Sequence, residues 1–230
     1  MEFGGIQKLS CLDYPGLVAC TVFTKGCNFR CPFCHNAPLV ATITPESIPE
    51  EEILAYLKKR QGLLEGITVT GGEPLLHPGL KAFLEKVKSL GYKVKLDTNG
   101  SKPAFLKELV AAGLVDKVAM DIKNGPSAYG FTVGDPNVDL SAVAQSKNYL
   151  LSGAVDYEFR TTVVKGLHTQ ASLLEAAQWI AGAKVWYLQC YEGRDTVLAP
   201  EGLSSFTAEE LYALLQSVKP HISTVALRGI

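Results

Sequence analysis

The 230-residue sequence has no long apolar run, no block of like charge and no low-complexity or Pro/Gly-rich stretch. Its longest apolar stretches have the length of a strand, and the N-terminal segment MEFGGIQKL lacks the basic and apolar regions of a signal peptide. We therefore expect a cytoplasmic protein without membrane association. The 22 basic and 23 acidic residues nearly cancel, which argues against binding to nucleic acid. A hydrophobic content of 47% is enough for a full core.

Apolar β-branched runs alternate with amphipathic helical patterns along the chain. Strands are predicted at 18–24, 67–70, 92–98, 117–123, 157–164, 184–190 and 223–227, and helices at 49–60, 79–90, 103–112, 139–151, 169–181 and 207–217. This repeated strand-helix order predicts an α/β fold with a parallel sheet. Because no linker or internal repeat divides the chain, residues 1–230 are interpreted as a single domain.

The middle strands are polar on one face. Lys95 and Asp97, then Asp121, then Glu158 and Arg160 alternate with apolar residues. Parallel strands covered on both faces are usually apolar throughout. We therefore favour a partial (β/α)6 barrel, an open TIM-like barrel with parallel strands, whose concave face is a wet, charged cavity. One solvated sheet face is the alternative interpretation.

Two long connections, 124–138 and 191–206, each follow a predicted strand. The carboxyl end of a parallel sheet is where ligands bind, and structureless loops of this length are uncommon unless they are functional. We expect both connections to frame a substrate opening, although they do not disclose which substrate enters.

Three of the six cysteines, Cys27, Cys31 and Cys34, lie within eight residues. In a reducing compartment such a group indicates a metal centre rather than disulfides. A structural zinc site needs four ligands, usually from two separated pairs, and the other cysteines are single. An iron-sulfur cluster held by three cysteines leaves one iron open for a small molecule. The remaining cysteines, Cys11, Cys20 and Cys190, are predicted to be packed thiols.

The cysteine spacing, with Phe33 directly before the third cysteine, resembles the signature of the radical S-adenosylmethionine enzymes. The chain is most similar to the activases of glycyl radical enzymes, in particular the anaerobic ribonucleoside-triphosphate reductase activating proteins. The motifs that carry this resemblance are Gly5-Ile6-Gln7-Lys8, Asp13-Tyr14-Pro15-Gly16, Gly26-Cys27-Asn28 and Cys34-His35-Asn36. It implies one 4Fe-4S cluster on the three cysteines, with S-adenosylmethionine chelating the open iron.

The resemblance also implies cofactor contacts at the strand ends. In Gly71-Gly72-Glu73-Pro74, Gly72 and Glu73 correspond to residues that bind the methionine amino group. Asp97, in an Asp-Thr-Asn-Gly motif, and Asp121 and Lys123, in an Asp-x-Lys motif, are expected at the methionine end, where the two aspartates are candidates to hold a monovalent cation.

Three further residues on strands five and six are candidates for the same cofactor. Arg160 lies on the inward face of strand five, where a guanidinium suits recognition of a carboxylate or hydroxyl. Gln189 and Tyr191 are candidates for the ribose side.

The implied reaction is reductive cleavage of S-adenosylmethionine to methionine and a 5'-deoxyadenosyl radical, which removes hydrogen from a glycine of a partner glycyl radical enzyme. The resemblance implies a flavodoxin or ferredoxin as electron donor and anaerobic conditions. Activation of pyruvate formate-lyase or another glycyl radical enzyme, a small-molecule reaction such as that of 7-carboxy-7-deazaguanine synthase, and a non-enzymatic zinc-binding adaptor stay open as alternatives.

Overall fold

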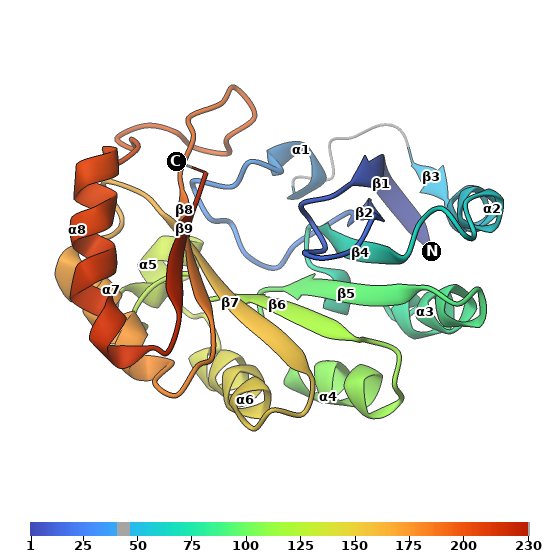
Figure 1. Cartoon of the computed structure of the whole chain (residues 1–230). Helices are drawn as coiled ribbons and strands as arrows, with labels where there is room; N and C mark the ends of the chain where they lie inside the picture. Colours follow the sequence, from blue (N-terminus) through green and yellow to red (C-terminus); the bar gives the residue numbers. More distant parts are fainter. Residues whose placement is uncertain (41–46, 230) are drawn as a thin grey trace.

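A curved nine-stranded sheet forms the centre of the computed structural model, which describes residues 1–40 and 47–229 (Figure 1). The strand order is β3-β1-β2-β4-β5-β6-β7-β8-β9. The strands are β1 (Glu2–Ser10), β2 (Ala19–Thr24), β3 (Ile48–Pro49), β4 (Gly66–Gly71), β5 (Lys93–Thr98), β6 (Lys117–Asp121), β7 (Asp156–Val163), β8 (Trp186–Cys190) and β9 (Val225–Arg228).

From β2 to β9, omitting β3, every neighbouring pair of strands is parallel, so the predicted α/β class and mostly parallel sheet are confirmed. The prediction missed β1 and β3, which extend the sheet beyond β2 with antiparallel pairing. β1 contains Gly4 and Gly5, which are weak strand formers, and β3 has only two residues. Neither segment therefore shows the continuous β-branched pattern on which the other strands were predicted.

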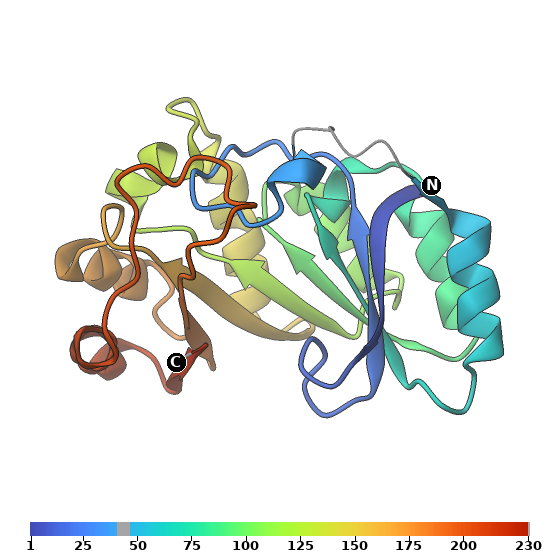
Figure 2. The same cartoon turned by 90° about the horizontal axis from the view of Figure 1, so that it is seen from above.

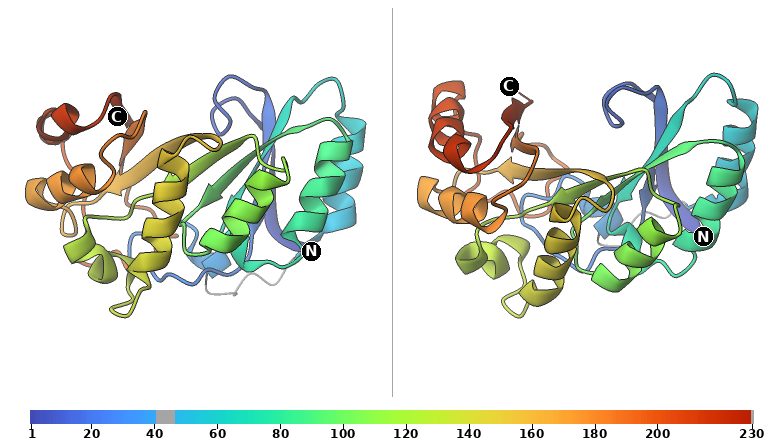
Figure 3. Two further views of the ribbon diagram at one scale, coloured as in Figure 1. Left: turned by 90° about the horizontal axis from the view of Figure 1, so that it is seen from below. Right: turned by 60° about the horizontal axis from the view of Figure 1, so that its bottom comes forward.

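Helices pack on the convex face of the sheet, where α3, α4 and α6 lie in sequence across it (Figure 3). The six predicted helices correspond to α2 (Glu50–Lys59), α3 (Leu80–Ser89), α4 (Pro103–Ala111), α6 (Leu140–Leu151), α7 (Gln170–Trp179) and α8 (Ala208–Val218). In α3, Leu80, Phe83, Leu84 and Val87 form the buried stripe, and Gly91 follows with φ +88°. The apolar core therefore lies between the helices and the outer face of the sheet.

Short helices occur where the sequence pattern predicted none. Helix α1 (Ala37–Val40) follows the cysteine segment, and the 3-10 turns are η1 (Pro74–Leu76), η2 (Pro126–Ala128) and η3 (Lys219–His221). The connection 124–138, expected to be structureless, contains η2 and α5 (Tyr129–Val133). The buried side chains of Tyr129 and Val133 anchor this helix, which is too short to show a clear helical period in the sequence.

The concave face is charged, as expected, but its deeper part is not wet. Lys95 is 2% exposed, and its Nζ lies 3.6 Å from Asp97 Oδ1 and 3.7 Å from Glu158 Oε1. The carbonyl of Asp13 accepts a hydrogen bond from the same Nζ at 2.6 Å. Lys95 is therefore a buried, paired cation, because the segment after β1 closes this end of the sheet. Among the residues that the structure describes, an open cavity lies at the carboxyl end of the concave face.

The connection 191–206 has no helix or strand and lies over the carboxyl end of the sheet, beside the cysteine segment (Figure 2). Leu198 N donates to the carbonyl of Cys34 at 3.1 Å, and Ala199 N donates to that of Pro32 at 2.9 Å. The connection thus forms one wall of the open end. Across the described ranges 1–40 and 47–229, no helix combines the length and the apolar character needed to cross a membrane.

Candidate functional site

The cysteine segment begins where β2 ends and is fixed by backbone hydrogen bonds at several points. Gly26 N donates to the carbonyl of Leu39 at 2.8 Å, and Cys34 N donates to that of Cys31 at 3.0 Å. Arg30 N donates to the carbonyl of Val133 in α5 at 2.9 Å. The segment is therefore held from both sides, by α1 and by the connection that follows β6.

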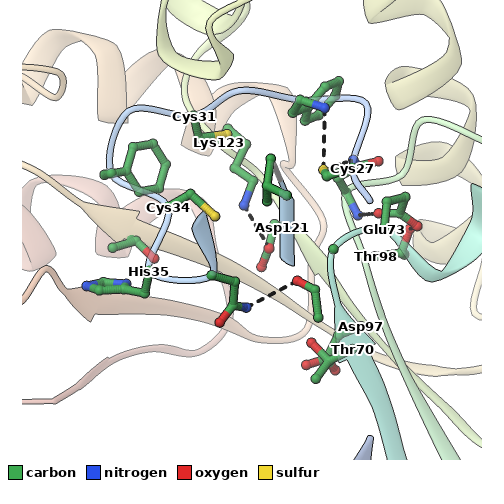
Figure 4. Close-up of a pocket in the computed structure, with 18 of the residues that line it drawn as sticks. Cys27, Cys31, Cys34, His35, Thr70, Glu73, Asp97, Thr98, Asp121 and Lys123 are labelled. Carbon is green, nitrogen blue, oxygen red and sulfur yellow. Dashed lines mark hydrogen bonds and ion pairs between the residues drawn. The ribbon is translucent and has the colours of Figure 1, made fainter. Parts of the chain in front are cut away.

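Eleven of the twelve residues singled out from the sequence line one cavity of about 280 Å³ at the carboxyl end of the sheet, part of which Figure 4 shows. They are Cys27, Cys31, Phe33, Cys34, Gly72, Glu73, Asp97, Asp121, Lys123, Arg160 and Gln189. Strands that are far apart in sequence bring these side chains together. The cysteines form one wall, and the charged strand ends face them.

The glycine pair after β4 permits the close approach of two backbone segments. A Cβ at Gly72 would lie 1.9 Å from the carbonyl oxygen of Gly26, and a Cβ at Gly71 would lie 2.4 Å from Thr24 N. Gly71 also has φ +109°, which disfavours other residues. Glu73 N donates to Gly26 O at 2.8 Å. The glycines therefore couple the cysteine segment to the Glu73 segment.

Glu73 is a buried carboxylate at the inner end of the cavity. Its Oε1 accepts from Thr98 Oγ1 at 2.7 Å and from Leu75 N at 3.1 Å, and its Oε2 accepts from Asn99 N at 2.7 Å. Burial raises the pKa of Glu73 to about 7, although these hydrogen bonds act in the opposite direction. An approaching ammonium group would favour the ionised form.

Arg160 joins two carboxylates on neighbouring strands. Its NH1 lies 2.9 Å from Asp97 Oδ2, and its NH2 lies 3.0 Å from Asp121 Oδ1. Lys123 Nζ lies 2.9 Å from Asp121 Oδ2. Burial alone would raise the pKa of Asp121, but Lys123 and Arg160 outweigh it and hold the pKa at about 2. The group is a fixed, ionised network.

His168, to which the sequence pattern assigned no role, supports this network. Its Nε2 lies 2.8 Å from the carbonyl of Lys123, and its Nδ1 accepts from Val164 N at 3.1 Å. These partners require a neutral ring with the proton on Nε2, and burial lowers the pKa of His168 accordingly. Lys123 Nζ lies 5.8 Å from the centre of the Phe33 ring. Lys123 is thus positioned from its backbone and along its side chain.

The three thiols have few polar neighbours. Burial raises the pKa of Cys27 and raises that of Cys31 to about 12, with Lys123 acting in the opposite direction in both. Cys27 Sγ accepts from Phe29 N at 3.4 Å, and Asn99 Nδ2 lies 3.8 Å from it. In the described ranges no three His, Cys, Asp or Glu side chains form a group for a single metal ion. The thiols instead line the wall of a larger cavity.

Three observations fit this cavity to a metal cluster with a polar cofactor. Three thiols, which are soft ligands, share one wall. Asp97 Oδ1 is buried and accepts no hydrogen bond from any residue that the structure describes, although the Lys95 ammonium lies 3.6 Å from it. Backbone at Gly72 approaches the cysteine segment more closely than any side chain would allow. The three thiols and the close backbone approach at Gly72 both fit a bound group.

The prediction that the other cysteines are packed thiols holds for Cys20, which is buried, but is wrong for Cys11, which is exposed. Cys190 is half-buried at the edge of a second cavity. Cys11 follows β1 directly, and that strand was not recognised in the sequence. The sequence pattern therefore did not indicate that Cys11 lies on the surface.

Gln189 and Tyr191 separate in the structure. Gln189 lines the cavity, whereas Tyr191 does not, because its ring is buried beside His35 with centroids 5.6 Å apart. The sequence reasoning also missed several polar residues of the cavity wall, namely His35, Asn36, Thr70, Asn99 and Thr162. Asn36 and Asn99 lie within the recognised motifs. Their position next to predicted site residues was therefore the signal that could have identified them as part of the cavity wall.

An open, mostly parallel α/β sheet with three cysteines on the loop after its first parallel strand, facing a charged cavity, defines a class of cofactor-dependent enzymes. The sequence profile described as "Radical SAM superfamily" matches residues 21–166. This chain belongs to the radical SAM superfamily. Its members use a 4Fe-4S cluster and S-adenosylmethionine.

The chain is similar to several named relatives. It is 28% identical over 231 residues to a protein of Methanocaldococcus jannaschii named as a candidate glycyl-radical enzyme activating enzyme, covering 98% of this chain and 95% of that protein. It is 32% identical to the pyruvate formate-lyase-activating enzyme of Staphylococcus epidermidis, over 52% of this chain and 51% of that protein. It is 37% identical to the 7-carboxy-7-deazaguanine synthase of Hyperthermus butylicus, over 40% of this chain and 38% of that protein.

Solved structures share the fold at low sequence identity. Streptococcus suis SuiB bound to its precursor peptide SuiA matches with a TM-score of 0.72 and 13% identity, covering 91% of this chain and 48% of that one. A domain of a pyruvate-formate lyase-activating enzyme from Bacteroides vulgatus matches with a TM-score of 0.58 and 16% identity, covering 72% of this chain and 99% of that one. These likenesses confirm the open-barrel fold.

Proposed function

We propose that this enzyme generates a glycyl radical in a partner protein, and that the partner is an anaerobic ribonucleotide reductase. The single observation that carries the proposal is the convergence of Cys27, Cys31 and Cys34 with a charged set of strand ends on one cavity. Similarity to an activating-enzyme relative over 98% of the chain supports the partner class. The lead-in motifs of residues 5–16 favour the reductase as the specific partner.

In this proposal Cys27, Cys31 and Cys34 hold the 4Fe-4S cluster. When bound, the cluster and S-adenosylmethionine supply the electron and the deoxyadenosyl radical that removes hydrogen from glycine. Glu73 accepts the cofactor ammonium, for which its buried, three-donor environment already fixes the oxygen positions. Gly72 keeps the backbone close to the cysteine segment, so that Glu73 and the thiols face one ligand.

The charged network holds its donors in place before the cofactor binds. Arg160 and Lys123 are fixed by Asp97 and Asp121, so little side-chain freedom is lost when their remaining N–H groups contact the cofactor carboxylate. Phe33 packs against Lys123 and limits water at the cluster side. A monovalent cation would have to share these aspartates with Arg160, with Lys123 and with Lys95, whose Nζ lies 3.6 Å from Asp97 Oδ1.

The proposal includes a flavodoxin or ferredoxin as electron donor. The three-cysteine group provides ligands for one cluster and not for a second, electron-transferring cluster, so the electron must come from another protein. The proposal also includes a cytoplasmic, anaerobic setting, since an iron without a protein ligand reacts with oxygen. We treat residues 1–230 as a single domain, because the cavity is built from segments between Cys27 and Gln189. Cutting the chain within that range would divide the site.

A small-molecule reaction is the second candidate function. The 37% identity to a 7-carboxy-7-deazaguanine synthase, over 93 residues, favours it, but the match covers only 40% of the chain. Activation of pyruvate formate-lyase is supported in the same partial way, over 52% of the chain. The zinc-adaptor alternative leaves the charged network around Arg160 without a purpose.

The test uses the anaerobically reconstituted enzyme with dithionite, S-adenosylmethionine and one candidate partner at a time. We expect a glycyl radical signal in electron paramagnetic resonance spectra with anaerobic ribonucleotide reductase and none with pyruvate formate-lyase. Formation of 5'-deoxyadenosine without any glycyl radical, together with turnover of a deazaguanine precursor, would reject the proposal. Bound zinc in place of iron would support the adaptor instead.

A further inference from the structure

Lys95 places a buried ammonium group next to the charged residues of the cofactor cavity. Its side chain is 2% exposed and lies on the concave face of β5, two residues before Asp97. The Nζ atom lies 2.6 Å from the carbonyl oxygen of Asp13, 3.6 Å from Asp97 Oδ1 and 3.7 Å from Glu158 Oε1. Carbonyl and carboxylate oxygens are the ligands that hard metal cations prefer in proteins. The Lys95 ammonium therefore occupies a position that would otherwise suit a metal cation.

Three separate parts of the chain surround this ammonium. The segment between β1 and β2 supplies the Asp13 carbonyl, β5 supplies Asp97 and β7 supplies Glu158. Burial alone would raise the pKa of Glu158, but Lys95 and Arg228 outweigh it and lower this pKa. Glu158 is therefore ionised, and its position opposite Asp97 holds the Lys95 ammonium between two carboxylates.

A metal ion at Asp97 and Asp121 would meet several side-chain cations. Arg160 contacts Asp97 Oδ2 at 2.9 Å and Asp121 Oδ1 at 3.0 Å. The second oxygen of Asp97 faces Lys95, and that of Asp121 lies 2.9 Å from Lys123 Nζ. A monovalent metal ion placed among these oxygens would have to displace one of the cations or be repelled by them at short range. The chain itself therefore neutralises both aspartates.

We propose that the Lys95 ammonium takes the place of a monovalent metal ion at the cofactor site, as a positioning residue for Asp97 and, through Asp97, for Arg160. Lys95 is not part of the cavity wall that the described residues form, so it acts without touching the cofactor. Its charge offsets that of Asp97, so that the remaining N–H groups of Arg160 stay directed to the cofactor carboxylate. The proposal rests on the cofactor contacts of the proposed function, but not on the identity of the protein substrate.

The test measures the dissociation constant of S-adenosylmethionine for the reconstituted enzyme at constant ionic strength in choline, potassium or ammonium chloride. The unmodified enzyme should bind the cofactor equally in all three salts, because Lys95 provides the cation. Lys95→Ala opens a space among the oxygens of Asp13, Asp97 and Glu158. In choline its affinity should fall about tenfold, the effect of losing one charge-assisted contact. Ammonium or potassium should fill the space and restore most of this loss.

Two further variants separate this role from a purely structural one. Lys95→Met keeps an apolar side chain of similar length but removes the charge. It should bind the cofactor about tenfold more weakly in every salt, because no space opens for an ion. Lys117→Ala is the matched control, since Lys117 Nζ lies 3.5 Å from Glu158 Oε2 and forms no ion pair with Asp97 in the part of the chain that the structure describes. It should bind the cofactor as the unmodified enzyme does in all three salts.

Tighter cofactor binding by the unmodified enzyme in potassium than in choline overturns the proposal, and so does unchanged affinity of Lys95→Ala in choline. A loss in Lys95→Ala that neither cation restores also overturns it, because Lys95 would then be a structural residue. If Lys95→Ala does not fold, the unmodified enzyme and Lys95→Met decide by the same comparison. Cation-independent cofactor binding without a glycyl radical in any partner rejects the proposed function alone. A glycyl radical formed by an unmodified enzyme that needs potassium to bind the cofactor rejects the role of Lys95 alone.

Discussion

Glu73 predicts a pH dependence of stability with an unusual sign for a carboxylate. Burial raises the pKa of Glu73 from 4.5 in the unfolded chain to about 7 in the folded protein. The folded state therefore binds more protons than the unfolded state between these values. The stability that protonated Glu73 contributes is fully present below about pH 4.5 and is lost as the pH rises through about 7.

The magnitude follows from the size of the pKa shift. A shift of about 2.5 pH units corresponds to about 3 kcal/mol of unfolding free energy across this window. Glu73→Gln removes the titration. The substitution also places an amide NH₂, which cannot accept a hydrogen bond, where an oxygen accepts from Thr98, Leu75 or Asn99. The lost hydrogen bond lowers the unfolding free energy by about 1–3 kcal/mol at every pH.

The assay is urea unfolding of the cluster-free protein at a series of pH values. We expect the unmodified protein to lose about 3 kcal/mol relative to Glu73→Gln on going from about pH 4.5 to pH 8. Glu50→Gln is the matched control, because Lys86 and the N-terminal ammonium outweigh burial and lower the pKa of Glu50. Its contribution should be lost as the pH falls, which is the opposite direction.

Parallel pH profiles for the unmodified protein and Glu73→Gln would refute this reasoning, since they would mean that Glu73 titrates equally in both states. S-adenosylmethionine should reverse the trend for the unmodified protein. A bound ammonium favours the ionised carboxylate, so affinity for the cofactor should rise with pH through about 7.

Three further predictions concern the ligands, the charged network and the glycine contact. Single alanine substitutions of Cys27, Cys31 or Cys34 should abolish the cluster and 5'-deoxyadenosine formation, measured by iron and sulfide content and product assay, whereas Cys11→Ala should retain both. Arg160→Leu removes one cation partner from each of Asp97 and Asp121, which keep Lys95 and Lys123, and should lower the unfolding free energy by about 1.5–3 kcal/mol in urea titrations; a loss no larger than that of Arg160→Lys contradicts this. Gly72→Ala places a Cβ 1.9 Å from a carbonyl oxygen and should lower the unfolding free energy, measured in urea titrations, by about 3 kcal/mol. Gly193→Ala, with open space around it, should leave the unfolding free energy nearly unchanged.

Much of the fold could be predicted because strand and helix periods are local properties of the chain. Each of the predicted strands and helices corresponds to an observed one, since β-branched runs and amphipathic stripes each record which face is buried. The hairpin strand β1 was missed because its pairing with β2 overrides a weak local preference at Gly4 and Gly5. Helix α5 was missed because Tyr129 and Val133 are stabilised by burial rather than by a helical repeat.

The sequence alone determined the chemistry available at the site. Three closely spaced cysteines and charged strand ends are local patterns, and parallel strands must bring their carboxyl ends to one edge. Which groups meet there was decided only by tertiary structure. The contact between Gly26 and Gly72, the bridge from Arg160 to Asp97 and Asp121, and the support of Lys123 by His168 all join distant segments. Such pairings depend on strand register and sheet curvature, which no local pattern records. For the same reason Lys95, expected to face water, is a buried cation, and Thr162 and Gln189, which are register partners on β7 and β8, line two neighbouring cavities.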